Sequence, residues 1–360
     1  MTPKILEVIK PALDSGFIGQ KFKPQYMEHW AQRHGLLSIP TESCPKNVTN
    51  VGGEKSYVLV SSLAKLETAL LRWTTNELVS KYKFTPVAVP NIIYDHIIDR
   101  CGFPTQSERS QVYKISGTNE ESIIDEKSPL ESTKGRTHSC IAGTSEFALA
   151  AIHIGDTISS EELPKRYCAT SRCYRAEASS TALEWGLYRV HYFNKVEMFG
   201  FSMPDKSKEL HDEFLDIQKT LFKQLGLQFQ VLDMPKEDLG LSATKKYDIE
   251  AWLQGRQRYG EISSTSNCED YQSSRLNIKY SDMVQRDDQL QFNTGFVHTV
   301  NGTACSTIRT LIALIEQHQT AEGRVKLPKV LVPYMKGIEY LPTQDDARLL
   351  TEVDLYPKPK

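Results

Sequence analysis

Strand-like segments crowd into one stretch of the chain, and this crowding limits the folds that the chain can adopt. Strands are predicted at 166–175, 189–201, 228–232, 246–252, 260–265 and 295–300. The one long amphipathic helix predicted among them has an apolar stripe of Leu210, Phe214, Ile217, Leu221 and Leu225, and Gly226 is expected to end it. Long strands with few crossover helices between them favour an antiparallel sheet with helices on one side, an α+β fold.

The residues ahead of these strands predict further elements of the same domain. Apolar residues recur at helical spacing at Leu63, Leu66, Leu70 and Trp73. Residues 84–89 are β-branched and stop at Pro90, so they predict a strand that ends sharply. Residues 117–136 are polar and charged and predict a surface loop. The N-terminal residues, up to about Gln25, are interpreted as a short appendage.

Composition excludes several classes of protein. The 360 residues carry 43 Lys and Arg against 45 Asp and Glu, so any contact with nucleic acid must depend on local rather than global positive charge. No apolar run reaches the ~18–20 residues that span a bilayer. The 7 cysteines are scattered without a C-x-x-C pair, which argues against a zinc knuckle or a disulfide framework and favours a reducing compartment. The first 32 residues contain no Arg, unlike a mitochondrial transit peptide.

Charged and aromatic residues alternate along two neighbouring predicted strands. Arg175 and Glu177 are two positions apart, and Arg189, Phe193 and Glu197 follow at intervals of four, so each set is expected on one face of its strand. Guanidinium groups bind phosphate or carboxylate, and a Phe ring can stack on a nucleotide base. An ordinary sheet face with cross-strand Arg–Glu pairs explains the same pattern.

Two later stretches have a similar polar character. Glu261, Ser263 and Thr265 are expected to share a strand face, where a carboxylate beside hydroxyls suits a magnesium ion already bound to phosphate. Residues 298–309 predict a strand that meets a Gly turn and opens a helix with Arg309, a junction that favours an anion. A Ser/Thr-rich edge strand and an ordinary helix start are the alternative interpretations.

Taken together and in order, these stretches resemble the catalytic domain of class II aminoacyl-tRNA synthetases, specifically the seryl-tRNA synthetase family and most closely its animal mitochondrial branch. The matching segments are 84–90 (motif 1), 144–146, 173–177 with 186–191 and 195–197 (motif 2), 246–252, 261–268, and 297–304 with Arg309 (motif 3). The similarity extends from about His29 to Met335. It implies an α+β class II catalytic domain, in which an antiparallel sheet is flanked by helices, over residues 29–340. Residues 1–28 would then be a short N-terminal appendage and residues 341–360 a C-terminal tail.

The resemblance implies a site for ATP, magnesium and serine. Its ATP-binding residues are Arg175 (α-phosphate), Glu177 (adenine), Arg189 and Arg309 (γ-phosphate), Phe193 (stacking under adenine), and Glu261 with Ser264, where Glu261 carries the magnesium. Of these, Arg175, Glu261 and Arg309 are the catalytic residues. Its serine-binding residues are Thr144 and Glu146 for the ammonium group, and Glu197, Asn301 and Thr303 for the hydroxyl.

The chain also departs from the family pattern. Residues 178–185, which form the loop that touches tRNA in the family, contain no Lys or Arg. Residues 272–275 contain one Arg where the family has two. No sustained heptad pattern precedes the catalytic similarity, so the family's coiled-coil arm is not expected in this chain.

These matches and departures leave three functional interpretations. The first is a serine–tRNA ligase that activates serine with ATP and transfers it to tRNA(Ser), binding the tRNA weakly. The second is a catalytically inactive paralogue, resembling the seryl-tRNA synthetase-like mitochondrial paralogue of insects, that dimerises with the true enzyme. The third, activation of an amino acid for a carrier protein, lacks the expected zinc ligands. Motif 1 predicts a homodimer, or a heterodimer with a longer synthetase. No membrane partner is expected, and mitochondrial location follows from the resemblance alone.

Overall fold

The structure is a computed structural model, and the parts of the chain that it describes contain nearly all of the predicted elements. It describes residues 2–10, 25–34, 36–38, 52–53, 55–107, 110–115, 138–177, 186–286, 289–344 and 346, without the side chains of 284–286 and 289–291. The predicted loop at 117–136 and the loop at 178–185 lie outside these ranges.

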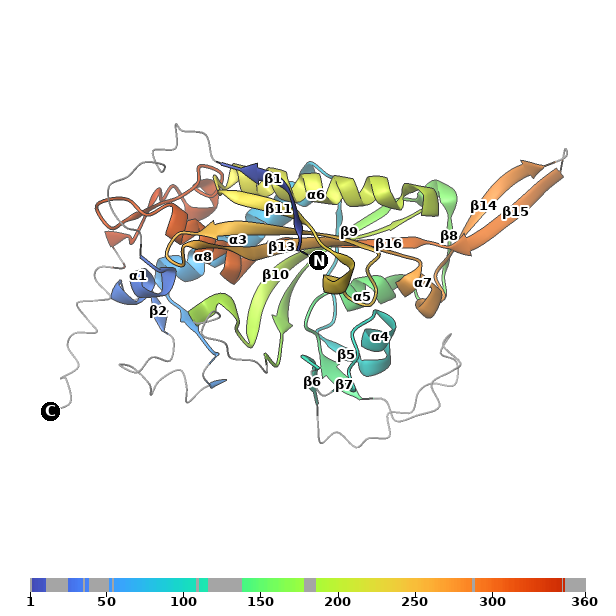
Figure 1. Ribbon diagram of the computed structural model, residues 1–360, viewed down its shortest axis with the longest axis horizontal. Helices are drawn as coiled ribbons and strands as arrows, with labels where there is room; N and C mark the ends of the chain where they lie inside the picture. Colours follow the sequence, from blue (N-terminus) through green and yellow to red (C-terminus); the bar gives the residue numbers. More distant parts are fainter. Residues whose placement is uncertain are drawn as a thin grey trace.

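An eight-stranded sheet forms the frame of the molecule (Figure 1). Its strands, in spatial order, are β1 (Lys4–Ile9), β11 (Phe229–Asp233), β12 (Lys245–Leu253), β13 (Arg258–Glu269), β16 (His298–Ser306), β10 (Tyr192–Ser202), β9 (Lys165–Tyr174) and β4 (Thr85–Pro86). Every neighbouring pair is antiparallel except β4 with β9, which is parallel. The prediction of an α+β fold built on an antiparallel sheet is therefore confirmed.

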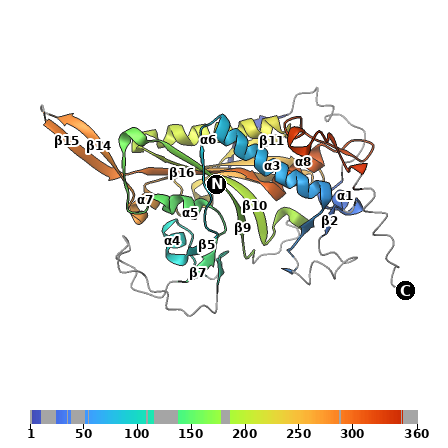
Figure 2. The ribbon, with the colours of Figure 1, turned by 180° about the vertical axis from the view of Figure 1, so that it is seen from behind.

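Three long helices pack on one face of this sheet. They are α3 (Ser61–Ser80), α6 (Ser207–Gln224) and α8 (Thr307–Gln317), and Figure 2 shows α3 and α6 running along the sheet. The predicted apolar stripe of α6 is buried. Gly226 follows the helix in the left-handed region, with φ +68°, as predicted for a residue that ends a helix.

The opposite face of the sheet is covered at one end by short elements. The side chains of β10 pack on both faces of the sheet. Val196 and Met198 belong to the cluster under the long helices. Phe199 and Phe201 pack on the other face with Phe147 of α5 (Glu146–Ala150). Other short elements on this side are α4 (Asp95–Arg100), α7 (Tyr271–Leu276), β5 (Ile92–Tyr94), β6 (Tyr113–Lys114) and β7 (Ser139–Ile141). Polar side chains line the cavity on the rest of this face.

The remaining elements lie around the sheet. They are α1 (Met27–Arg33), β2 (Leu37–Ser38), β3 (Val58–Leu59), β8 (Thr157–Ser159), β14 (Lys279–Arg286), β15 (Gln289–Phe296), β17 (Val325–Lys326), β18 (Tyr340–Leu341), and the 3-10 turns η2 (Ala151–His153), η3 (Ser160–Glu162), η5 (Gly186–Tyr188), η6 (Pro204–Lys206), η7 (Lys236–Asp238) and η8 (Pro333–Met335). The sequence did not predict the β14–β15 hairpin, which projects from the body in both views (Figures 1 and 2).

Several predicted boundaries differ from the structure. The strand predicted at 84–89 has only two residues in β4, and Arg189 precedes β10 instead of lying within it. Residues 295–300 are divided between β15 and β16, because Val297 lies between these two strands and belongs to neither. Within the predicted appendage, residues 4–9 form β1 and pair with β11, so this segment extends the main sheet.

Two negative findings concern the described residues. None of their helices is both long enough and apolar enough to cross a membrane. The cysteines among them, Cys101, Cys140, Cys168, Cys173, Cys268 and Cys305, are all free and buried, in line with the expectation that no disulfide framework supports the fold.

The packing of α6 against the sheet makes a stability prediction. Phe214 is fully buried on α6 against Phe84, so Phe214→Ala is expected to lower the free energy of unfolding by about 3–5 kcal/mol, measured by urea denaturation. Phe292→Ala is the matched control, since Phe292 is 75% exposed and its loss is expected to change little. Equal effects of the two substitutions would contradict this account of the core.

Candidate active site

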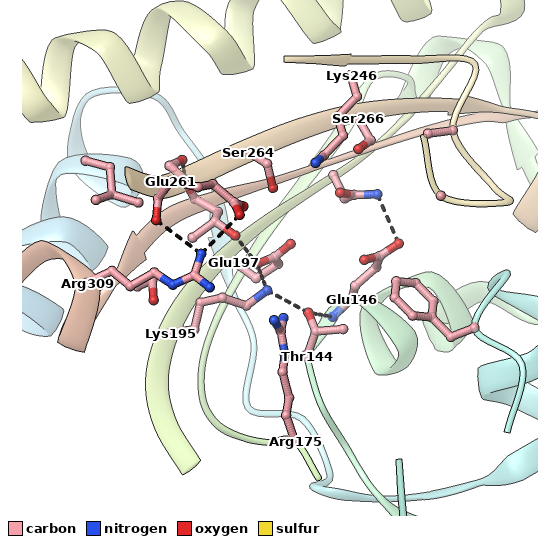
Figure 3. Close-up of a pocket in the computed structure, with 18 of the residues that line it drawn as sticks. Thr144, Glu146, Arg175, Lys195, Glu197, Lys246, Glu261, Ser264, Ser266 and Arg309 are labelled. Atoms are coloured by element: carbon pink, nitrogen blue, oxygen red, sulfur yellow. Dashed lines mark hydrogen bonds and ion pairs between the residues drawn. The ribbon is translucent and has the colours of Figure 1, made fainter. Parts of the chain in front are cut away.

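A polar cavity of about 260 Å³ opens on the sheet face opposite the long helices. It is lined by Phe103, Thr144, Glu146, Arg175, Phe193, Lys195, Glu197, Gly240, Ser242, Ala243, Lys246, Glu261, Ile262, Ser263, Ser264, Ser266, Asn301, Thr303, Ser306 and Arg309. The predicted site residues that are missing from this lining are Glu177 and Arg189. Both line a smaller adjoining pocket, which shares Arg175, Phe193, Ser306 and Arg309 with the main cavity. The structure therefore brings all the predicted site residues into one region. Figure 3 shows residues that line the main cavity.

A β-bulge in β13 decides which of its side chains face the cavity. The pairing with β12 passes from Ile249–Ser263 to Glu250–Glu261, so Ile262 is an extra residue and the alternation of faces changes there. Glu261 consequently shares the cavity face with Ser264 and Ser266. The prediction that Glu261 shares a face with Ser263 and Thr265 is wrong for this reason.

The hydroxyls of Ser263 and Thr265 point toward α6. The Ser263 hydroxyl donates to the carbonyl oxygen of Thr303 at 2.5 Å and accepts from the Gln218 amide at 2.9 Å. The Thr265 hydroxyl donates to the carbonyl oxygen of Asn301 at 2.8 Å. These hydroxyls fix the spacing of β13 and β16 beneath the cavity.

A second bulge shifts β16 in the same way. Its pairing with β10 passes from Val196–Cys305 to Glu197–Thr303, and Ala304 is the extra residue. Thr303 and Ser306 therefore both line the cavity. The chain continues as strand through Gly302 to Ser306, so the predicted Gly turn before the helix with Arg309 is absent from this described stretch.

Positive and negative charges meet at one end of the cavity. The Arg309 guanidinium donates from Nη1 to Glu261 Oε2 and to the Glu261 carbonyl oxygen, each at 3.1 Å. Burial acts to raise the pKa of Glu261, but the charges of Arg309, Lys246 and Arg175 lower it overall, so this carboxylate is ionised at neutral pH. The Arg175 guanidinium lies over the Phe193 ring, 5.2 Å from its centroid. This end offers several cationic groups and one aromatic face.

The adjoining pocket holds Glu177 and Arg189, which form an ion pair of 3.4 Å between Oε2 and Nη1. Both were expected on strand faces, but Glu177 comes after the end of β9 and Arg189 after η5. Glu177 has φ +43°, a left-handed conformation that disfavours a side chain and that no strand pattern predicts. These two residues therefore lie outside the regular strands, and their placement does not follow from the alternation of the sheet.

The other end of the cavity is built around a buried carboxyl group. Glu146 accepts hydrogen bonds from the side-chain amides of Gln272 at 2.8 Å and Asn301 at 3.0 Å. Burial, and then the neighbouring charge of Glu197, raise the pKa of Glu146 to about 7. A cationic ligand beside Glu146 would therefore stabilise its ionised form.

Lys195 joins this end of the cavity and was not among the predicted site residues. Its Nζ lies 2.5 Å from Glu197 Oε2 and donates to Thr144 Oγ1 at 2.8 Å, and Thr303 donates to the same Glu197 oxygen at 3.3 Å. Lys195 and Glu197 are both buried. Their spacing of two along β10 was a usable signal, because it places Phe193, Lys195 and Glu197 on one face.

Other cavity residues that the sequence did not single out come from less regular places. Lys246 stands at the start of β12 and pairs with Asp248 at 2.8 Å, and Ser242 belongs to the loop ahead of β12. Ser266 and Ser306 reach the cavity because of the two bulges. Lys246 and Ser266 fall inside the matching segments 246–252 and 261–268, whereas Ser242 and Ser306 had no such signal.

The donors at Glu261 fit a magnesium ion that is shared with phosphate. Among the described residues, no group of three or more His, Cys, Asp or Glu is placed to hold a metal ion by itself. The ionised Glu261 carboxylate and the Ser264 hydroxyl lie on one face of the cavity, and oxygen donors of this kind suit magnesium that takes its other ligands from phosphate and water.

Comparisons with known proteins agree with this geometry. Residues 130–318 match the family model described as tRNA synthetase class II core domain (G, H, P, S and T). The mitochondrial serine–tRNA ligase of Mus musculus is 41% identical over 292 residues, which is 81% of this chain and 52% of that protein. The serine–tRNA ligase of Rhodopirellula baltica is 37% identical over 318 residues, 87% of this chain and 67% of that protein.

A solved structure shows the same relationship. The crystal structure of seryl-tRNA synthetase from Pyrococcus horikoshii complexed with ATP matches with a TM-score of 0.75 and 30% identity, covering 89% of this chain and 65% of that one. The fold is thus that of a class II aminoacyl-tRNA synthetase core. Within that class, the chain belongs to the seryl-tRNA synthetase family. It spans about half the length of the mitochondrial relative that it matches.

The raised pKa of Glu146 predicts how stability depends on pH. Because the folded protein retains the Glu146 proton up to a pKa of about 7, this group costs stability as pH rises from its ordinary pKa of 4.5 through 7. Glu146→Gln mimics the protonated carboxyl, so the variant is expected to gain roughly 2–3 kcal/mol relative to the wild type between pH 5 and pH 8. Urea unfolding of both proteins at the two pH values measures this. An unchanged difference between them would contradict the assignment.

Proposed function

We propose that this chain activates serine with ATP to seryl-adenylate and transfers the seryl group to tRNA(Ser), the reaction of a serine–tRNA ligase. The observation that carries the proposal is the pairing, within one cavity, of a cationic end around Arg175 and Arg309 with a carboxylate end around Glu146 and Glu197. ATP and serine carry the complementary charges. Membership of the seryl-tRNA synthetase family supports the same assignment.

The cationic end would receive ATP. Arg175 would contact the α-phosphate, where the serine carboxylate attacks and from which pyrophosphate leaves. Arg309, with Arg189 from the adjoining pocket, would bind the γ-phosphate. Phe193 would stack under the adenine, and Glu177 would accept from its amino group. Pre-placed guanidinium groups stabilise charge on the transferring phosphoryl group without reorganising during the reaction.

Magnesium would bind at this same end. Glu261 and Ser264 supply the protein oxygens, and the ion, when bound, would neutralise phosphate charge during the displacement. Because Arg309 pairs with Glu261 at 3.1 Å, Arg309 must exchange this carboxylate for phosphate as ATP and magnesium arrive. The ion pair would thus keep both groups in place before substrate binds.

The carboxylate end would receive serine. Its ammonium group would contact Thr144 and Glu146, which shifts Glu146 to the ionised form. Its hydroxyl would lie among Glu197, Asn301 and Thr303. An amino acid without this hydroxyl would leave those buried polar groups unpaired, which is how a site of this kind discriminates strongly. Lys195 neutralises Glu197 and so limits the repulsion between the two carboxylates.

The second half of the reaction would take place in the same cavity. The hydroxyl of the 3′-terminal ribose of tRNA(Ser) attacks the seryl carbonyl, and AMP leaves. We expect weak binding of tRNA, because residues 178–185 contain no Lys or Arg for its phosphates. Mitochondrial location is supported by the similarity to the mouse mitochondrial ligase.

Pyrophosphate exchange tests the activation step. The wild-type protein is expected to catalyse serine-dependent exchange between pyrophosphate and ATP, and Arg175→Ala is expected to lower the rate about 10²–10³-fold, as for removal of a group that stabilises transition-state charge. Arg324→Ala is the control, because Arg324 lies over Tyr340, a residue that is not among those lining the cavity.

A second candidate function is that of an inactive paralogue that dimerises with the true mitochondrial enzyme. The absence of Lys and Arg at 178–185 is the observation that favours it. If the folded wild-type protein catalyses no exchange, this second function replaces the first.

Either function would involve a dimer. Beside motif 1 lies an apolar depression of about 510 Å³, lined in part by Val87, Val89 and Ile93. Ile92 and Tyr94 are 59% and 48% exposed at its edge, which is unusual for large apolar side chains. We infer that a second copy of the chain, or a longer synthetase, covers this surface.

The mass of the protein in solution tests this surface. The wild type is expected to be a dimer at micromolar concentration, and Ile92→Asp is expected to give monomers, because dimerisation would bury an unpaired charge. Leu241→Asp is the control, since Leu241 is 68% exposed at a residue that does not line the depression. A monomeric wild type, or a dimeric Ile92→Asp variant, would contradict the inference.

A further inference from the structure

Two charged side chains from the N-terminal part of the chain reach the two ends of the connection between β9 and β10. Lys55 Nζ donates to the carbonyl oxygen of Glu177 at 2.6 Å, where the chain leaves β9. Glu28 Oε1, on α1, accepts from the backbone amide of Leu187 at 3.0 Å, where the chain returns through η5. Both contacts bridge more than a hundred residues of sequence.

The contact at Glu177 selects an uncommon backbone conformation. Glu177 has φ +43°, and its carbonyl oxygen is directed at the Lys55 ammonium. Lys55 is itself held against β10, because His191 donates its backbone amide to the Lys55 carbonyl at 3.2 Å. Two residues on, the Tyr57 ring stacks on Tyr192 with 4.8 Å between centroids. Lys55 therefore acts from a fixed position on a strained residue of the adjoining pocket.

The contact at Leu187 involves a fully buried charge. Glu28 is 0% exposed, and its Oε1 also accepts from Arg256 Nη2 at 2.7 Å. A Cβ on Gly186, which has φ +77°, would lie 2.3 Å from this same oxygen. The Glu28 carboxylate is thus packed directly against the backbone of η5, and only glycine fits at residue 186.

The effect of Glu28 extends from η5 to the cationic end of the cavity. Tyr188 follows Leu187, and its hydroxyl donates to the Glu261 carbonyl oxygen at 3.0 Å. The Arg309 guanidinium lies 4.6 Å from the centroid of the same ring. A displacement of η5 would therefore move the ring on which Arg309 rests.

We propose that Glu28 and Lys55 are positioning residues for the nucleotide subsite: Lys55 fixes Glu177, and Glu28 fixes Tyr188 and, through it, Arg309. The proposal rests on the proposed function, since it assumes that this subsite binds ATP. Neither residue lines the main cavity or the adjoining pocket, so neither is expected to touch substrate. The serine end, around Glu146 and Glu197, is independent of both.

Calorimetric titration with ATP and magnesium, and separately with serine, tests the proposal. Lys55→Met is expected to raise the Kd for ATP about tenfold, as for loss of one charge-assisted hydrogen bond, and to leave the Kd for serine unchanged. Lys55→Arg is expected to restore ATP binding, because its guanidinium can donate to the same carbonyl. Lys206→Met is the matched control, since Lys206 forms an exposed ion pair with Glu209 and does not line the cavity or the adjoining pocket.

Glu28→Gln provides the second variant. Its amide oxygen can still accept from Leu187, but the charge beside Arg256 is lost, so a smaller rise in the Kd for ATP is expected than for Glu28→Ala. Thermal unfolding of each variant shows whether it is folded, and Lys55→Met and Glu28→Gln serve if Glu28→Ala does not fold.

The outcomes separate this inference from the proposed function. If the wild type binds ATP and Lys55→Met and Glu28→Gln bind it equally well, the positioning inference alone is wrong. Equal losses for ATP and serine would also overturn it, because they would indicate a general structural defect. If the folded wild type binds no ATP, the proposed function fails, and the inference fails with it.

Discussion

The extra residues in β13 and β16 set the composition of the cavity, and the rest of the site depends on them. A regular strand would direct Glu261 toward the cavity together with Ser263 and Thr265, and would leave Ser264 under α6. Because of the bulge, the hydroxyls of Ser263 and Thr265 bond β13 to β16 beneath the cavity. Glu261 and Ser264 face the cavity instead. The bulge in β16 likewise separates the side chains that face the cavity from those that pack in the core.

Charge compensation is the second general feature of the site. Lys195 with Glu197, and Arg309 with Glu261, form two ion pairs in the cavity, and removing one partner from such a pair leaves an uncompensated charge in a poorly solvated place. Glu146 has no cation at hydrogen-bonding distance in this structure and instead has its pKa raised to about 7. Among the carboxyl groups that line the cavity in the described part of the chain, Glu146 is thus the one without an ion pair, and it is the group that the proposed serine ammonium would neutralise. Ligand charge would then be part of the electrostatic balance of the protein.

The fold and the members of the site were largely predictable from sequence, whereas their alignment was not. The main strands were predicted, and the spacing of the α6 stripe identified that helix, because such short-range patterns arise from local geometry. The bulges at Ile262 and Ala304 have no such pattern, and the one at Ile262 is the reason that Glu261 was predicted on the wrong face relative to Ser263 and Thr265. Glu177 and Arg189 lie outside the regular strands, beside contacts that Lys55 makes at Glu177 and Glu28 makes at Leu187, and no periodicity encodes such contacts between distant residues. Motif resemblance found these residues because it does not depend on their conformation.

The edge strand β1 has a consequence for how the chain reaches its fold. Its partner β11 comprises Phe229–Asp233, so residues 4–9 leave the ribosome long before the strand with which they pair has been made. Even in the finished sheet, Ile5, Leu6 and Val8 remain about half exposed, and during synthesis their backbone groups also have no partner. An apolar segment in that condition pairs readily with other chains. β1 is therefore made well before β11 can secure it, and during that interval its exposed apolar side chains and unpaired backbone leave the chain open to aggregation.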